Sequence, residues 1–194
     1  TWALFLTKPS DLGYPDIGYE LPELRVHEEV VSVDNSTAGA DRDGQVKMFR
    51  EAALGLADAA KERRDNMQEK IARVVEIINR PENKDDHFLL WHDLEAEREA
   101  LCKAIPGCKA VYGSQDDDEA DRVIADFKDG RLKYLAAKPE MLGEGLNFQY
   151  HCHKAIMFID YRFNDKFQAI ARIYRFMQQH PVELYLVYAE SEGE

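Results

Sequence analysis

The sequence predicts an α/β fold, in which a mostly parallel β-sheet carries helices on both of its faces. From residue 88 onward, short apolar runs alternate with helix-like segments, which is the pattern of a parallel sheet with helical connections. The helix-like segments stop at the turn signals Pro106-Gly107 and Asp129-Gly130. Because connections between parallel strands are right-handed, the elements should form three layers. Ligands are then expected at the carboxyl ends of the strands.

The first third of the chain carries fewer clear elements. Strands are expected at Trp2–Leu6, which is apolar, and at Arg25–Val33, where valines alternate with polar residues. Residues 8–23 and 34–44 contain glycine and many polar residues, and we expect irregular connections there. Residues 45–79 contain no proline and predict helix. An apolar stripe at helical spacing supports that helix, formed by Ile71, Val74, Val75 and Ile78.

The remaining elements follow in regular order. The expected strands cover residues 88–91, 109–112, 131–138, 155–159 and 183–188. The expected helices cover residues 94–104, 118–127 and 164–176.

The composition is that of a globular domain. The 194 residues are 45% hydrophobic and 32% charged, and no apolar run approaches the length of a membrane span. Three cysteines without framework spacing favour a reducing cytoplasm. No signal peptide is visible, and the abrupt start at Thr1 suggests a piece of a longer protein. The formal net charge of −12 predicts weak nonspecific binding to nucleic acid.

Candidate functional residues are densest between Leu142 and Gln178. A glycine-bearing loop is followed by an apolar strand and then by Gln168, Arg172 and Arg175. On a helix, spacings of four and three residues place these three side chains on one face. Paired arginines on a rigid element suit an anion with several oxygens, such as a triphosphate.

The same residues carry a family resemblance. Gly145-Leu-Asn147, followed by Gln168, Arg172, Arg175 and Gln178, resembles motifs V and VI of the second RecA-like lobe of Snf2-type superfamily 2 helicases and translocases. The resemblance is closest to the bacterial and phage type. One departure is Met177, which stands where the family usually has glycine.

Weaker matches extend the resemblance along the chain. Phe88–Trp91 resembles the motif IV strand of that family, and Gly113-Ser114 with Arg122 to Phe127 resembles a further family segment. Leu21–Leu24 resembles the segment that leads from the first lobe to the second. The resemblance therefore implies three parts: residues 1–44 connect from a first lobe, 45–82 form a helical segment, and 83–194 form a RecA-like helicase C-terminal lobe.

The implied protein is a DNA-dependent ATPase that moves along double-stranded DNA. ATP and Mg²⁺ would be bound mainly by the first lobe, and this lobe would complete the site. The resemblance implies arginine fingers at Arg172 and Arg175. It implies nucleotide-cleft roles for Gly143, Gly145, Asn147 and Gln168. It implies contacts to the DNA backbone from Ser114, Lys138 and Asn147.

Several other patterns have simpler explanations. The sequence Asp118-Glu-Ala-Asp121 spells a helicase motif, but it opens a helix, where acidic residues favour the helix dipole. His151-Cys-His153 lies on an extended segment, so its side chains cannot all converge on a metal. We expect packing roles for Cys102 and Cys108 and assign no role to His87 and His92.

No Gly-x-x-x-x-Gly-Lys-Ser/Thr sequence is present, so we expect no ATP hydrolysis by this chain alone. Two alternatives stay open. One is a degenerate RecA-like binding module without an ATPase role. The other is an acidic protein-interaction domain whose functional surface is the helical stretch Gln45–Asn79.

Overall fold

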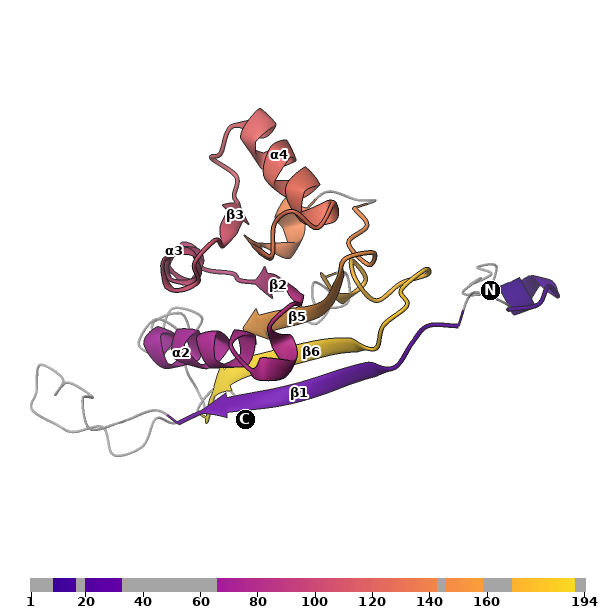
Figure 1. Cartoon of the computed structure of the whole chain (residues 1–194), viewed down its shortest axis with the longest axis horizontal. Coiled ribbons are helices and arrows are strands. Elements are labelled where there is room, and N and C mark those ends of the chain that lie inside the picture. Colours follow the sequence, from indigo (N-terminus) through magenta and orange to yellow (C-terminus); the bar gives the residue numbers. More distant parts are fainter. Residues whose placement is uncertain (1–8, 17–19, 33–65, 143–145, 159–168, 191–194) are drawn as a thin grey trace, which may run out of the picture.

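A single parallel β-sheet forms the centre of the computed structural model, which describes residues 9–16, 20–32, 66–142, 146–158 and 169–190. Its six strands lie in the order β1-β6-β5-β2-β4-β3, and each pair of neighbours is parallel (Figure 1). The strands are β1 (Leu24–Val31), β2 (His87–Trp91), β3 (Lys109–Val111), β4 (Tyr134–Ala137), β5 (Cys152–Phe158) and β6 (Val182–Ala189). The predicted parallel α/β sheet is confirmed.

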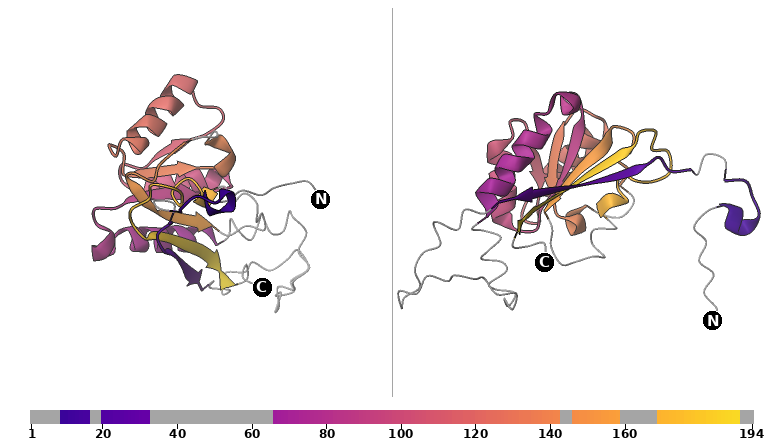
Figure 2. Two further views of the ribbon diagram at one scale, coloured as in Figure 1. Left: turned by 90° about the vertical axis from the view of Figure 1, so that its right-hand side faces the viewer. Right: turned by 90° about the horizontal axis from the view of Figure 1, so that it is seen from below.

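Each connection covers the face of the sheet that is set by the direction in which the chain moves from one strand to the next across the sheet. The chain passes from β1 to β2 through α2 (Met67–Ile78), and from β2 to β3 through α3 (Glu95–Ala104). It then turns back through α4 (Asp117–Lys128) to β4, and continues to β5 and β6. Right-handed crossovers in opposite directions must cover opposite faces. The two helix layers on either side of the sheet can be followed in Figure 2.

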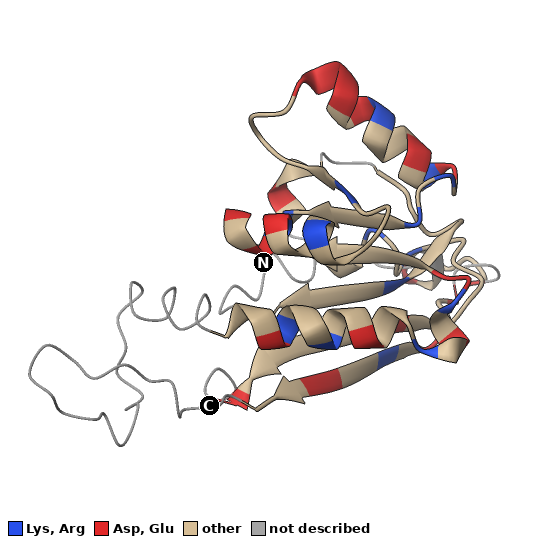
Figure 3. Ribbon diagram, turned by 60° about the vertical axis from the view of Figure 1, so that its left-hand side comes forward, with Lys and Arg blue, Asp and Glu red and all other residues tan. Residues whose placement is uncertain are grey.

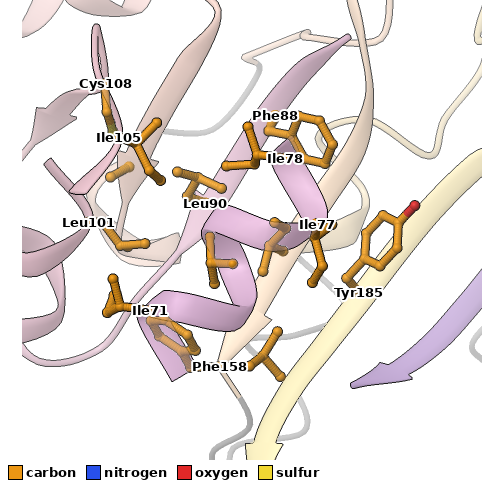
Figure 4. Packing of buried hydrophobic residues seen from close by; sticks show 14 of the residues in the cluster. Ile71, Ile77, Ile78, Phe88, Leu90, Leu101, Ile105, Cys108, Phe158 and Tyr185 are labelled. Atoms are coloured by element: carbon orange, nitrogen blue, oxygen red, sulfur yellow. The ribbon is translucent and has the colours of Figure 1, made fainter. Parts of the chain in front are cut away.

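One face of the sheet packs against α2 and α3. The stripe predicted on α2 is buried through Ile71, Val74 and Ile78, with Val75 partly buried at its margin. These side chains meet the sheet residues Phe88, Leu90, Ile156, Phe158 and Tyr185, and α3 adds Leu101 (Figure 4). Every second residue of the strands faces this cluster, as the pleat requires.

The opposite face packs against α4 and two irregular connections. Phe127 of α4 is almost fully buried and lies edge-on to Phe148, with 5.1 Å between the ring centroids. The alternate strand residues Leu89, Leu135, Ala155 and Leu184 belong to the same cluster. Buried residues on both faces explain why the central strands read as continuous apolar runs.

The start of the chain joins the sheet as an edge strand. β1 pairs with β6 in parallel register from Leu24 opposite Val182 to Val31 opposite Ala189. The expected strand at 2–6, the loop at 34–44 and most of the expected helix at 45–79 lie outside the described residues. The predicted domain boundaries stay predictions for that reason. None of the described helices is long and apolar enough to cross a bilayer.

The expected helix at 164–176 is wrong over its second half. Residues 164–168 lie outside the described part, residues 169–170 are helical, and residues 171–177 form turns and bends. Arg172 N and Ile173 N bond to carbonyls three residues back, which is the tighter geometry of a helix that is ending. Phe176 is consequently 42% exposed instead of facing the sheet, whereas Ile173 is buried.

Charged residues of both signs are interspersed over the helices and strands (Figure 3). Acidic residues gather at the start of α4, where Asp116 caps the helix by accepting a hydrogen bond from Glu119 N at 3.3 Å. The capping interpretation of the Asp118–Asp121 sequence is therefore confirmed, since it lies in the first turns of this helix.

Candidate functional site

Two connections run side by side across the α4 face of the sheet. The first leads from β4 to β5 and the second from β5 to β6. Phe148 N donates to Arg172 O at 3.2 Å, and the Gln149 side-chain amide donates to Phe176 O at 3.3 Å. The residues that sequence reasoning assigned to motifs V and VI are thus neighbours in space.

Both candidate arginines reach across this boundary. Arg172 Nη2 donates to Leu142 O at 2.9 Å, and Arg175 Nη1 lies 3.5 Å from Leu146 O. The two acceptors flank residues 143–145, the glycine-bearing loop. Both arginines are half-buried. The prediction that both arginines share one helix face is wrong, because the helix ends before Arg172. The two side chains are instead held by Leu142 O and Leu146 O, on either side of residues 143–145.

Within the described part of the chain, each guanidinium contacts a backbone carbonyl through one of its nitrogens. An arginine side chain has five N–H donors in a rigid fork, and each of these two contacts uses one of them. A guanidinium held by a backbone carbonyl is pre-oriented, so less conformational entropy is lost when it meets an anion. The arrangement can therefore bind phosphate oxygens near the 143–145 loop.

Gln178 holds the end of the second connection in place. Its side-chain amide donates to Cys152 O and Ile173 O, both at 3.1 Å, and its carbonyl accepts from His180 N at 3.0 Å. The residue is only 6% exposed. These hydrogen bonds hold the end of the segment that carries both arginines. The sequence analysis noted Gln178 only as part of a motif.

Met177 adopts a backbone conformation that favours glycine. Its φ is +74°, and among the described residues it is the one non-glycine with positive φ. A left-handed conformation costs an L-residue roughly 1–2 kcal/mol. The family that the sequence resembles usually has glycine at this position. The backbone of Met177 has the positive φ that glycine adopts easily, although methionine carries a Cβ.

Ser114 and Lys138 meet at the carboxyl ends of the strands. They line a hollow of about 300 Å³ together with Glu95, Tyr112, Gly113, Glu140 and Met141. Lys138 Nζ lies 3.3 Å from Glu95 Oε1, so part of its charge is already balanced. Sequence reasoning missed Glu95, whose position at the first turn of α3 gave no sign of this contact.

A buried histidine lies close enough to Glu95 and Lys138 of this hollow for their charges to act on its ring. His92 directly follows β2 and is 3% exposed. Burial lowers the pKa of His92 to about 4; Glu95 acts in the opposite direction, whereas Lys138 and Arg98 add to the lowering. The ring is therefore neutral at pH 7, and a negative group beside Lys138 would favour its protonation.

The remaining candidates are distributed differently. Asn147 is half-buried on the first connection and does not line the hollow with Ser114 and Lys138. Its side-chain carbonyl is buried without a hydrogen-bond partner in the described part of the chain. Gly143, Gly145 and Gln168 lie outside the described residues, so their expected roles stay predictions.

The His151-Cys152-His153 side chains go to separate surroundings. The His151 ring is 6.4 Å from the ring of His87, Cys152 is buried, and His153 Nε2 is 3.5 Å from Asp86 Oδ1. Within the described ranges, no group of three or more His, Cys, Asp or Glu residues is arranged to hold a metal ion.

Comparisons with known proteins find similarity in structure. No protein-family model and no curated protein matches the sequence. The C-terminal part of the Fun30 ATPase domain matches with a TM-score of 0.55 and 16% identity, over 63% of this chain and 41% of that one.

Two structures of S. cerevisiae Dbp5 variants bound to Gle1 and IP6 also match. The longer one has a TM-score of 0.52 and 12% identity, over 88% of this chain and 36% of that one. The Dbp5 C-terminal domain has a TM-score of 0.51 and 15% identity, over 66% of this chain and 74% of that one. The chain therefore spans less than half of the first two matched chains, and its fold is the RecA-like three-layer sandwich.

Proposed function

We propose that this chain is the second motor lobe of a Snf2-like, ATP-dependent DNA translocase. The observation that carries the proposal is the pair of arginine contacts to Leu142 O and Leu146 O on either side of the glycine-bearing loop. These contacts support the proposal because both guanidinium groups lie against the connection to which the resemblance assigns the nucleotide cleft. The similarity in fold to the C-terminal part of the Fun30 ATPase domain and to the Dbp5 C-terminal domain supports the same proposal.

In the proposed mechanism, ATP and Mg²⁺ bind mainly to another lobe of the motor. Arg172 and Arg175 approach the β- and γ-phosphates when the two lobes close. Negative charge on the phosphoryl oxygens is stabilised by guanidinium groups that are already oriented. Leu142 and Leu146, whose carbonyls the two arginines contact, belong to the motif V connection, so closure at the phosphates would be coupled to that connection. Gly143, Gly145, Asn147 and Gln168 complete that side of the cleft.

Nucleic acid is proposed to bind along the carboxyl ends of the strands. Ser114 offers a hydroxyl donor and Lys138 an ammonium group at the hollow. A phosphate there has to compete with Glu95 for Lys138, because those two side chains are 3.3 Å apart. This competition, together with the net charge of −12, implies weak binding by the lobe alone. Double-stranded DNA is the proposed track, from the family resemblance.

The test is single-turnover ATP hydrolysis in a polypeptide that joins this chain to a first lobe. Arg175→Ala should lower the hydrolysis rate by about 10³-fold, as expected for an arginine finger, with nucleotide binding weakened far less. Arg131→Ala is the matched control, since Arg131 is exposed, lies just after α4, and pairs with Asp126 of α4 and with Asp129 at the end of that helix. A melting curve of each variant shows whether the fold is kept.

The possible outcomes separate the two arginines. If Arg175→Ala hydrolyses ATP at the parent rate, Arg175 is not the finger and Arg172 becomes the candidate. If both single variants keep the parent rate, the motor proposal loses its chemical basis.

A further inference from the structure

Two cysteines face each other at the opposite end of α3 from the hollow. Cys102 lies in the last turn of α3 and Cys108 just before β3. Their sulfur atoms are 3.9 Å apart and share a hydrogen bond. Packing alone was expected of this pair from the sequence, but the distance is short enough for chemistry between the two thiols.

The connection between them can accommodate a bond. A disulfide needs about 2.05 Å between sulfurs, so the two atoms must approach by about 2 Å. The intervening turn contains Gly107 at φ +81°, where even an added Cβ would contact nothing. Cys108 N donates to Ile105 O at 3.1 Å, and the buried Ile105 anchors the turn from the other side. The approach therefore requires adjustment of a short surface turn, and the sheet need not move.

The two thiols differ in accessibility and in proton affinity. Cys102 is half-buried and Cys108 is buried. The pKa of Cys102 is lowered to about 7 by the hydrogen bond with Cys108 and by the positive charges of Arg98 and Lys109, although burial opposes them. The shared hydrogen bond and burial raise the pKa of Cys108. Thiolate is the reactive form, so Cys102 is suited to attack first. Once the Cys102 sulfur is part of a mixed disulfide, its charge no longer raises the pKa of Cys108, which can then attack in turn.

We propose that Cys102 and Cys108 form an oxidisable dithiol that reacts with small disulfides such as oxidised glutathione. The Cys102 thiolate attacks one glutathione sulfur, which forms a mixed disulfide and releases a glutathione thiolate. Cys108 then gives its proton to the released glutathione thiolate and attacks Cys102 Sγ. This attack forms the Cys102–Cys108 disulfide and displaces the second glutathione as a thiolate. The second glutathione thiolate takes up the proton that Cys102 had lost. The two thiols lose two electrons together, and one oxidised glutathione becomes two reduced ones.

Trypsin mapping of the full chain gives a direct test. Cleavage after Arg98, Lys103 and Lys109 places the two cysteines on separate peptides, Glu99–Lys103 and Ala104–Lys109. After incubation with oxidised glutathione, these two peptides should appear as one disulfide-linked species. The denatured protein should retain one free thiol of the original three. If the linked species is absent, the proposal is wrong.

Single variants test the order of the steps. Cys108→Ala should accumulate the glutathione adduct on Cys102, and Cys102→Ser should yield neither adduct nor linked peptides. Cys152→Ala is the matched control: Cys152 is fully buried, burial raises its pKa to about 12, and its loss should leave the linkage unchanged. Alkylation by iodoacetamide at pH 7 should label Cys102 at least about 10²-fold faster than Cys152.

Two outcomes overturn the proposal even if every variant folds. One is equal labelling rates for Cys102 and Cys152 in the native protein. The other is a Cys108→Ala variant that stays free of adduct under conditions where the parent becomes oxidised. Thermal melting of the reduced variants verifies that each retains the native fold before the reaction is scored.

Discussion

Acidification should destabilise this protein through His92, and the size of the effect follows from its surroundings. The residue is 3% exposed. Burial lowers its pKa from 6.5 to about 4 in the folded state. The unfolded chain therefore binds a proton at higher pH than the folded chain does. Stability from this group is complete above pH 6.5 and is lost as the pH falls towards 4.

The magnitude comes from the gap between the two pKa values. Each pH unit corresponds to about 1.4 kcal/mol, so the gap from 6.5 to about 4 predicts a loss of about 3 kcal/mol from His92 alone. His153 acts in the same direction, because burial lowers its pKa as well. The contribution of His92 must therefore be isolated by a variant that cannot be protonated.

His92→Phe is that variant, and urea unfolding between pH 7 and pH 4 is the measurement. The Leu94 backbone interacts with the His92 ring and slightly opposes the lowering of its pKa. Leu94 O also accepts from Glu97 N at 3.1 Å and from Arg98 N at 3.2 Å, so an apolar ring does not leave this carbonyl without a partner. The difference in unfolding free energy between parent and variant should change by about 3 kcal/mol across this range. His151→Gln, at an exposed position, is the control. Parallel pH profiles for parent and His92→Phe would refute the assignment.

Three further predictions concern activity, binding and local strain. The chain alone should hydrolyse no ATP in the presence of DNA, because it lacks a phosphate-binding loop; turnover that survives further purification would contradict this. Duplex DNA should bind the chain weakly, no tighter than the nonspecific range of about 10⁻⁴ to 10⁻⁶ M, and the affinity should fall with salt. Lys138→Ala should weaken binding and reduce the salt slope by about one; tight binding that is insensitive to salt would contradict both expectations. Because the φ of Met177 is +74°, Met177→Gly should raise the free energy of unfolding by roughly 0.5–1 kcal/mol, and Met177→Ile should lower it. Thermal unfolding measures both; an isoleucine variant more stable than the glycine variant would show that the conformation is not strained.

The sequence was most informative where the secondary structure and burial of a residue depend on residues close to it in the chain. The apolar runs of β2, β4 and β5 are buried on both faces, which makes them recognisable from composition alone. The ends of α3 and α4 were marked by Pro106-Gly107 and Asp129-Gly130. The α/β class and the order of these elements could therefore be predicted before any contact was known.

Long-range contacts limited prediction of the site. The spacing of Arg172 and Arg175 suggested one helix face, but their positions depend on the carbonyls of Leu142 and Leu146 in another connection. The end of the helix after residue 170 had no sequence signal comparable to a glycine or proline. Nothing in the local sequence around Lys138 could reveal Glu95 as its partner, because only the fold brings them together.

The pairing of β1 with β6 has a mechanical consequence. The two strands are parallel over eight residue pairs, and both begin at the same edge of the sheet (Figure 1). A pull on the chain before Leu24, opposed by an anchor after Ala189, acts along the strands in opposite directions. It loads the ladder of backbone hydrogen bonds in shear, so the bonds share the tension and do not open one at a time. The pairing of β1 with β6 is therefore suited to bear a force that is applied through residues preceding β1.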